Sequence, residues 1–184
     1  PVAPEYEPMM AELLGFRTRP APVLAATVGT GFEVLVIGAG VSGMALGIEL
    51  ARAGVPFRIL EKNHEVGGTW LENRYPGCGV DTPSYLYSFS FMPHRWSTHF
   101  GKRDEVESYL RLVADEHGLR RHIEFGVEVT DLTWDGEASH WRVTQRRADG
   151  STTVRTAPFV VTAVGQLNRP KIPAVAGAET FTGS

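Results

Sequence analysis

The sequence has only one cysteine, no strong excess of either charge and no long apolar segment. A single thiol, Cys78, excludes an internal disulfide and any site built from several cysteines, and we expect it to be a small buried or loop thiol. The net charge of −3 also argues against a general nucleic-acid binder, which carries a basic face. No apolar run approaches the roughly 20 residues that cross a bilayer, and the start does not resemble a signal peptide. We therefore expect a cytoplasmic protein with no nucleic-acid or membrane partner.

The chain does contain the alternation of strand and helix that is typical of an α/β fold. Residues 33–37 (EVLVI) are almost all apolar and predict a parallel strand that is buried on both faces. Apolar side chains then recur at helical spacing over residues 41–53, and residues 57–60 predict a second strand that ends at Glu61. We expect a β-α-β unit, whose crossover is almost always right-handed.

The segment Gly38-Ala39-Gly40-Val41-Ser42-Gly43 joins the first strand to this helix. Its first glycine permits a tight turn, Gly40 lets a pyrophosphate approach the backbone, and Gly43 lets helix and strand pack closely. The start of the helix presents free N–H groups and its positive dipole end to a phosphate. Glu61 follows at the end of the second strand, where a carboxylate can accept hydrogen bonds from the ribose hydroxyls and would repel a 2′-phosphate. These residues predict dinucleotide binding and leave both FAD and NAD open as the ligand.

The second half of the chain predicts one more helix and then several strands. Residues 104–117 have the pattern of an amphipathic helix, and the turn at residues 148–151 favours a hairpin. The strand-like runs are residues 122–125, 127–134, 140–147 and 153–164. We expect an α/β, Rossmann-like FAD/NAD(P)-binding fold with a parallel sheet and an inserted antiparallel β-meander.

A second glycine pair occurs in Gly67-Gly68-Thr69-Trp70. Such a pair gives the backbone another close approach to a pyrophosphate, and Trp70 could lie against a flat ring. The alternative is a surface turn with a core tryptophan. The histidines show no metal-ligand spacing, so we expect surface or packing roles for them. We expect Arg120 and Arg121 to be solvated at a helix exit.

Taken together, these motifs resemble those of the type I Baeyer–Villiger monooxygenases, which are flavoproteins with two dinucleotide-binding domains. Arg74-Tyr75-Pro76-Gly77 followed by Asp81 is the most specific part, because flavin monooxygenases that oxidise nitrogen or sulfur usually lack it. Residues 5–10 are similar to the end of the extension seen in hydroxyacetophenone-type members. The resemblance rests on GAGVSG (38–43), LEKN (60–63), GGTW (67–70), NRYPG (73–77), Asp81, YLYSFSF (85–91), TAVGQL (162–167) and PKIP (170–173).

The resemblance implies roles for individual residues. Asp81 corresponds to the family's active-site aspartate, whose partner is an arginine from a later NADPH-binding domain; without the family, Asp81 is as readily a turn or cap aspartate. Gly79 and Val80 would approach NADPH, and Tyr87 would lie beside the flavin. The FAD-binding residues that the resemblance implies are Gly38, Gly40, Val41, Ser42, Gly43, Glu61, Lys62, Gly68, Thr69, Trp70, Leu71, Glu72 and Val129.

The resemblance also implies a reaction and a division into domains. The implied activity, with FAD as cofactor, is the NADPH- and O₂-dependent conversion of a ketone to an ester or lactone through a C4a-peroxyflavin. We expect residues 1–31 to be an N-terminal arm and residues 32–184 to be the N-terminal part of the FAD-binding domain. Phe181-Thr182-Gly183 resembles the opening of the family fingerprint FxGxxxHxxxW, so we expect the NADPH domain to lie outside this chain and the chain alone to be inactive. An N- or S-oxidising flavin monooxygenase and a non-catalytic dinucleotide-binding module stay open as alternatives.

Overall fold

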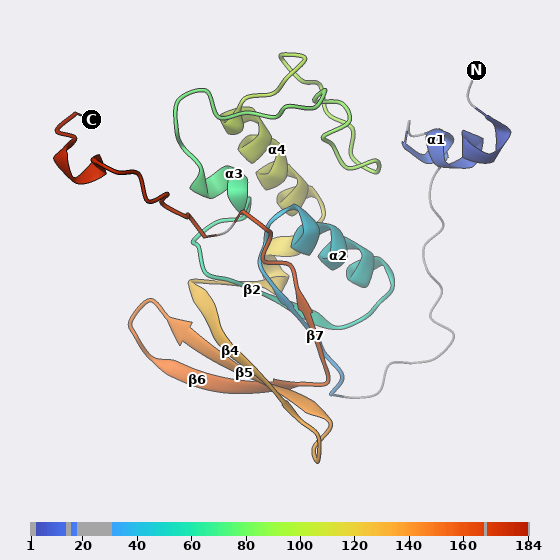
Figure 1. The fold of residues 1–184 in the computed structure, drawn as a ribbon. Helices are drawn as coiled ribbons and strands as arrows, with labels where there is room; N and C mark the ends of the chain where they lie inside the picture. Colours follow the sequence, from blue (N-terminus) through green and yellow to red (C-terminus); the bar gives the residue numbers. More distant parts are fainter. Residues whose placement is uncertain (1–2, 14–15, 18–30, 168, 184) are drawn as a thin grey trace.

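The computed structural model describes residues 3–13, 16–17, 31–167 and 169–183. A parallel sheet forms the middle layer, with helices on one face and an antiparallel sheet on the other (Figure 1). The parallel sheet has the order β3 (Ile123–Phe125), β2 (Phe57–Glu61), β1 (Val34–Ile37), β7 (Phe159–Thr162). The antiparallel sheet has the order β4 (Val127–Asp135), β5 (His140–Arg147), β6 (Thr152–Ala157). This architecture confirms the expected fold class.

Two longer helices, α2 (Val41–Arg52) and α4 (Arg103–Glu116), form the layer that covers one face of the parallel sheet. They pack their apolar sides with β1 and β2 into one core (Figure 1). Among the described residues, no helix is both long enough and apolar enough to span a membrane. The helical elements are η1 (Pro4–Tyr6), α1 (Glu7–Leu13), α2 (Val41–Arg52), α3 (Thr69–Glu72), α4 (Arg103–Glu116), η2 (Leu119–His122) and η3 (Ala178–Thr180).

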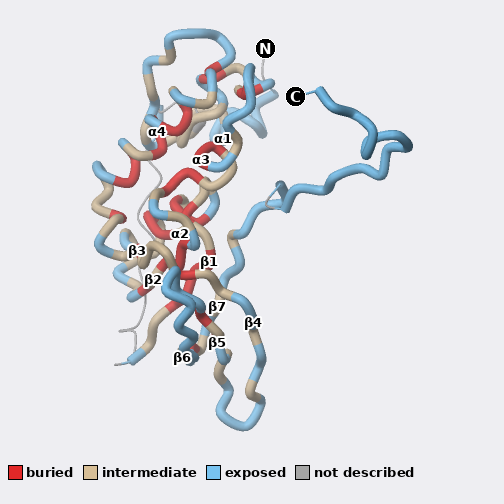
Figure 2. The backbone as a smooth tube through the Cα atoms, turned by 90° about the vertical axis from the view of Figure 1, so that its left-hand side faces the viewer, coloured by how far each residue is buried: buried red, intermediate tan, exposed pale blue. Residues whose placement is uncertain are grey.

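Strand β1 is central because its side chains are apolar on both faces. Val34 and Val36 belong to the core shared with the helices, whereas Leu35 and Leu60 pack toward the antiparallel sheet. Figure 2 shows that the buried residues gather in β1, β2 and the helices α2, α3 and α4. Because β1 pairs in parallel with β2 and β7, the carboxyl ends of all three meet at one edge, where ligands bind in open α/β sheets.

One strand expectation is wrong, because residues 153–164 do not form a single strand. The run divides into β6, which pairs antiparallel with β5, and β7, which pairs in parallel with β1. Pro158 lies between them, and proline has no N–H with which to continue a ladder. The break at Pro158 lets the chain leave the antiparallel sheet and return to the parallel one.

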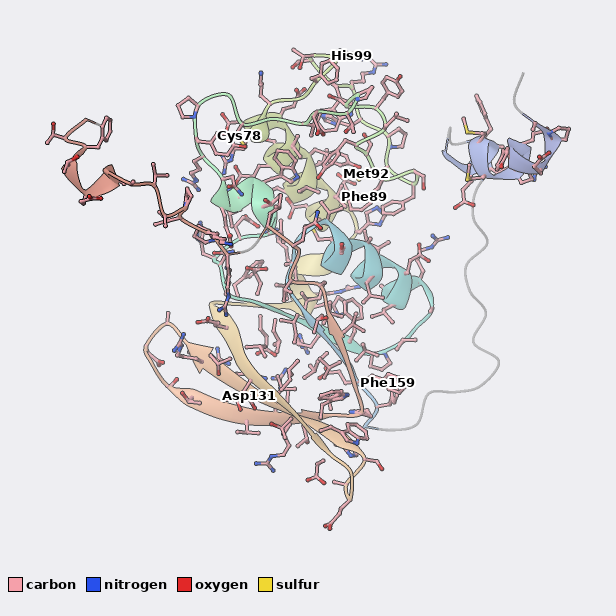
Figure 3. All side chains as sticks on the ribbon, in the orientation of Figure 1. Cys78, Phe89, Met92, His99, Asp131 and Phe159 are labelled. Carbon is pink, nitrogen blue, oxygen red and sulfur yellow. The ribbon has the colours of Figure 1, made fainter. Side chains whose placement is uncertain are left out.

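The other predicted strands and helices agree with the structure to within one or two residues at their ends. The hairpin turn is also confirmed, with Arg147 N donating to Ser151 O over 2.9 Å. Cys78 is 8% exposed, and its carbonyl accepts a hydrogen bond from Arg103 N at the start of α4 (Figure 3). The prediction of a small buried thiol is therefore confirmed.

The long loop between α3 and α4 is fixed to α4 by Tyr109. The Tyr109 hydroxyl accepts a hydrogen bond from Phe89 N over 2.8 Å and donates one to Met92 O over 2.9 Å (Figure 3). The rings of His94 and Trp96 also lie against Tyr109. His94 thus has the packing role that its sequence context predicts.

Candidate functional site

The glycine-rich turn after β1 is tightly constrained. Gly38 has φ +101°, and a Cβ on it would lie 2.7 Å from Ala163 O. A Cβ on Gly43, in the first turn of α2, would lie only 1.9 Å from Gly38 O. Since backbone atoms cannot move aside as a flexible side chain can, both positions require glycine. This confirms that Gly38 serves the turn and Gly43 the close packing of helix and strand.

The start of α2 is arranged to receive an anion. Gly40 is its N-cap residue and supplies no side-chain hydrogen bond, and the first turn contains no acidic residue. The first N–H groups of a helix have no partner within the helix, and the dipole adds partial positive charge there. Val41 and Ser42 lie in this turn and line the pocket described below. The helix start therefore favours a phosphate group.

Glu61 ties the turn to β2. It is 3% exposed, and its Oε2 accepts a hydrogen bond from Ala39 N over 2.6 Å while Oε1 accepts one from Asn63 N over 2.8 Å. Each carboxylate oxygen can accept more than one hydrogen bond, so both retain capacity for a hydroxyl group. The carboxylate thus both holds the glycine turn and faces the pocket.

The second glycine pair lies directly against the first turn. Gly67 N donates to Ala39 O over 3.1 Å, and a Cβ on Gly68 would lie 3.0 Å from Gly40 Cα. The loop after β2 therefore packs against the loop after β1, and glycines of both loops line the pocket described below. Glycines there leave the backbone accessible to a pyrophosphate, which needs close approach to N–H groups.

Trp70 lies behind this second loop rather than on its open side. It is 8% exposed, and its indole Nε1 donates a hydrogen bond to the Tyr87 hydroxyl over 2.9 Å. The two rings meet edge to face with their centroids 5.5 Å apart. Tyr87 lines the pocket and Trp70 supports it from beneath, so the structure favours the core tryptophan over a ring stacked on the ligand.

A pocket of about 710 Å³ opens where β1, β2 and β7 end. This volume lies in the range of small-molecule and cofactor sites. Gly43, Trp70 and Leu71 are not among the residues that line it. Contact with a cofactor stays a prediction for these three residues and for the predicted residues that do line the pocket. The predicted cofactor residues that line it are Gly38, Gly40, Val41, Ser42, Glu61, Lys62, Gly68, Thr69, Glu72, Tyr87 and Val129.

The structure does not bring Asp81 and its neighbours into this pocket. Gly79 forms an isolated antiparallel bridge with Lys102, and Val80 N donates to Gly101 O over 3.0 Å. Asp81 is exposed, and within the described part of the chain its side chain has no hydrogen bond or ion pair. The carboxylate is therefore open to a partner of opposite charge.

The rim of the pocket contains residues to which sequence reasoning gave no role. Gln166 and Arg169 line it from the segment after β7, and Glu128 lines it from β4. A hydrogen bond from Arg146 lowers the pKa of Glu128; burial opposes this effect, and the charges of Arg146, Lys62 and Arg169 add to it. The rule that ligands lie beyond the carboxyl ends of parallel strands could have identified the residues after β7.

Arg120 corrects one expectation, because it is not simply solvated. Its Nη1 and Nη2 donate hydrogen bonds to the two carboxylate oxygens of Glu65 over 2.8 and 3.2 Å, and its Nε also pairs with Asp115. Arg121 is exposed, as expected. Glu65 lies 55 residues away from Arg120 in the sequence, so a local sequence pattern cannot predict this contact.

Comparison with sequence families gives two matches. The NAD(P)-binding Rossmann-like domain matches residues 36–102, and the family described as L-lysine 6-monooxygenase/L-ornithine 5-monooxygenase matches residues 82–182. The first agrees with the glycine turns and the parallel sheet. The second is a family of monooxygenases.

Individual relatives match over most of this chain. A Baeyer–Villiger monooxygenase of Streptomyces coelicolor is 43% identical over 153 residues, which is 82% of this chain and 28% of that protein. One from Pseudomonas aeruginosa is 35% identical over 172 residues, which is 92% of this chain and 31% of that protein. The chain thus spans under a third of the length of these relatives.

Solved structures agree in fold. OTEMO in complex with FAD and NADP has a TM-score of 0.73 at 32% identity and covers 83% of this chain and 29% of its own. Cyclohexanone monooxygenase from Rhodococcus sp. Phi1, bound to NADP⁺, has a TM-score of 0.72 at 37% identity and covers 82% of this chain and 29% of its own. The chain belongs to the flavin-dependent monooxygenases, and these relatives confirm the Baeyer–Villiger family that its motifs resemble.

Proposed function

We propose that this chain is the FAD-binding portion of an NADPH- and O₂-dependent monooxygenase that converts ketones to esters or lactones. The observation that carries the proposal is the close packing of Gly68 against Gly40 at the pocket that the buried Glu61 also lines. A Cβ on Gly68 would lie only 3.0 Å from Gly40 Cα, so this approach of the two loops needs glycine. The structures of relatives in complex with FAD and NADP support the same ligands here.

The residues present fit FAD by their chemistry. The N–H groups at the start of α2 and at Gly68 would hold the pyrophosphate, and Glu61 would accept hydrogen bonds from the adenosine ribose. Tyr87, supported by Trp70, would border the flavin and help to exclude water. FAD, when bound, supplies electron transfer from NADPH and the reaction with O₂.

Asp81 is proposed as a positioning residue for the reaction. Its exposed carboxylate can hold a guanidinium by a bidentate bond, and a cation fixed in this way stabilises negative charge that develops during oxygen transfer. The arginine would come from outside this chain, as would most residues of the ketone pocket. We also propose that residues 32–184 are part of the FAD domain, whereas residues 1–2, 14–15 and 18–30 of the predicted arm lie outside the described residues. We further propose a cytoplasmic location.

A second candidate is an enzyme that oxidises nitrogen. The match of residues 82–182 to the L-lysine 6-monooxygenase/L-ornithine 5-monooxygenase family favours it. The Arg74-Tyr75-Pro76-Gly77…Asp81 pattern favours the Baeyer–Villiger reaction, and all of those residues lie before the matched region.

A segment exchange tests the reaction class. Residues 32–183 of this chain would replace the aligned segment of the Streptomyces coelicolor relative, and ketone and amine oxidation would be measured alongside flavin content. We expect the chimera to keep FAD and to oxidise ketones. A chimera that holds FAD but does not oxidise ketones would count against the Baeyer–Villiger reaction and in favour of the second candidate. Ester formation by residues 1–184 alone would contradict the proposal that the arginine and most of the ketone pocket lie outside these residues.

A further inference from the structure

Helix α4 carries a row of alternating charges along one side. Glu107 is 7% exposed and lies between two arginines at i−4 and i+4. Its Oε2 lies 2.7 Å from Arg103 Nη2, and its Oε1 pairs with Arg111 Nη2. Because Glu107 has both partners on its own helix, its charge is neutralised where it is buried.

The row continues from α4 into the loop that precedes the second glycine pair. Glu65 in this loop lies with its Oε2 3.9 Å from Arg111 Nε and is held bidentately by Arg120, in η2. The α4 ion-pair network, as we call it, consists of Arg103, Glu107, Arg111, Glu65, Arg120 and Asp115.

Both ends of the segment 65–71 are attached to this network. At its beginning, Glu65 Oε1 also accepts a hydrogen bond from the N–H of Val66, which is fully buried. At its end, Arg103 donates to two carbonyls of α3, from Nε to Trp70 O over 2.6 Å and from Nη2 to Leu71 O over 3.1 Å. Between these two attachments lie Gly68 and Thr69, which line the pocket.

Such attachments matter because the helix in this segment is too short to be stable on its own. Helix α3 is four residues long, and one isolated turn is unstable in water. Exposed ion pairs contribute little, but here the side chains of Arg103 and Glu65 are each only 14% exposed, and the Arg120 contact is bidentate. Burial raises the pKa of Glu65, and hydrogen bonds from Arg120 and the Val66 amide, with the charges of Arg120 and Arg111, lower it to below its ordinary value. Glu65 is therefore held as a carboxylate.

We propose that the α4 ion-pair network positions residues 65–71 for the cofactor, with Arg103 and Arg120 acting as positioning residues that never touch it. The cofactor part of this inference rests on the proposed function, whereas the positioning of the segment does not. Neither arginine lines the pocket. Their effect passes through the carbonyls of α3 and the carboxylate of Glu65 to the backbone at Gly68.

The first test measures how readily the backbone of residues 66–71 opens in the chain without ligand. Arg120→Gln removes the bidentate contact, and Arg121→Gln is the matched control, since Arg121 is exposed and its Nε bonds to His122 rather than to a carboxylate. We expect amide hydrogen exchange at residues 66–71 to become about tenfold faster in Arg120→Gln and to stay unchanged in Arg121→Gln. Amides of β1 should keep wild-type protection in both. If Arg120→Gln loses protection throughout, Glu65→Gln repeats the comparison with a side chain of the same shape.

The second test measures FAD affinity by flavin fluorescence. We expect Arg120→Gln to bind FAD about tenfold more weakly and Arg121→Gln within about twofold of wild type. Arg120→Lys should restore only part of the affinity, because an ammonium group cannot make the bidentate contact.

The two tests distinguish failure of the proposed function from failure of the positioning role. If wild type binds no FAD, the proposed function fails, and exchange at residues 66–71 still decides the positioning role. If exchange at these residues is equal in Arg120→Gln and Arg121→Gln, the positioning role is overturned. Faster exchange with unaltered FAD affinity overturns the part of the inference that concerns the cofactor.

Discussion

The nucleotide pocket and the loop that carries Asp81 both contain a carboxylate of functional interest, yet the two are built in opposite ways. Glu61 is 3% exposed and accepts hydrogen bonds from two backbone N–H groups of this chain. Asp81 is exposed, and no side-chain partner exists for it among the described residues. The contrast supports a chain that forms its cofactor site from its own backbone and leaves its reaction site to be completed by other residues.

The largest expected effect comes from filling the glycine turn. In Gly43→Ala the new Cβ meets Gly38 O, which is backbone and cannot move aside, so we expect stability to fall by roughly 3 kcal/mol and FAD binding to be lost. Urea unfolding and flavin retention measure both. Gly136→Ala is the control, since its Cβ would make only an ordinary 3.8 Å contact with Trp134 Nε1, and it should change stability by less than about 0.5 kcal/mol.

Glu61→Gln separates the two functions of the buried acid. The amide replaces one acceptor by a donor that faces a backbone N–H, so we expect a loss of about 2 kcal/mol in stability and roughly 100-fold in FAD affinity. Denaturation and FAD titration would be compared with Glu33→Gln, a partly exposed acid just before β1. Lost stability with wild-type FAD affinity would show that Glu61 serves only the turn.

Tyr87→Phe tests the support that Trp70 gives to the pocket wall. The change leaves the buried indole N–H without its acceptor, which costs about 1 kcal/mol. Thermal unfolding measures the loss of stability, and tryptophan emission measures the change around the indole of Trp70. Unchanged stability would mean that another group takes over the indole N–H.

The pH dependence of stability tests Glu65. Its pKa is lowered in the folded chain, so its contribution is fully present above the unfolded value of about 4.3 and is lost as the pH falls through the lowered folded value. Urea unfolding between about pH 6 and pH 3 should therefore show a smaller loss in Glu65→Gln than in wild type. Parallel curves would contradict the ion-paired carboxylate.

The smallest effect is expected at Asp81. Because its side chain has no contact to lose, Asp81→Asn should change stability by less than about 0.5 kcal/mol and leave FAD affinity unaltered. A marked loss of FAD affinity would place Asp81 in the cofactor site and remove the contrast with Glu61.

The sequence was informative where neighbours in sequence are also neighbours in space. The turn at Gly38 and the acid at Glu61 follow from spacing along one β-α-β unit, and the structure places both as predicted. The division of residues 153–164 was missed because their strand-like pattern runs on both sides of Pro158. The Arg120–Glu65 contact could not be foreseen, because no local pattern pairs charges so far apart in the chain.

Titration of the purified chain with FAD, in parallel with Glu61→Gln, tests the central claim most directly. Equilibrium dialysis should show saturable binding of one FAD per wild-type chain, much weaker binding to Glu61→Gln, and little competition from NADH. Tight binding of NADH without FAD, or no saturable binding of FAD to the wild-type chain, would contradict the assignment of this pocket to the flavin cofactor.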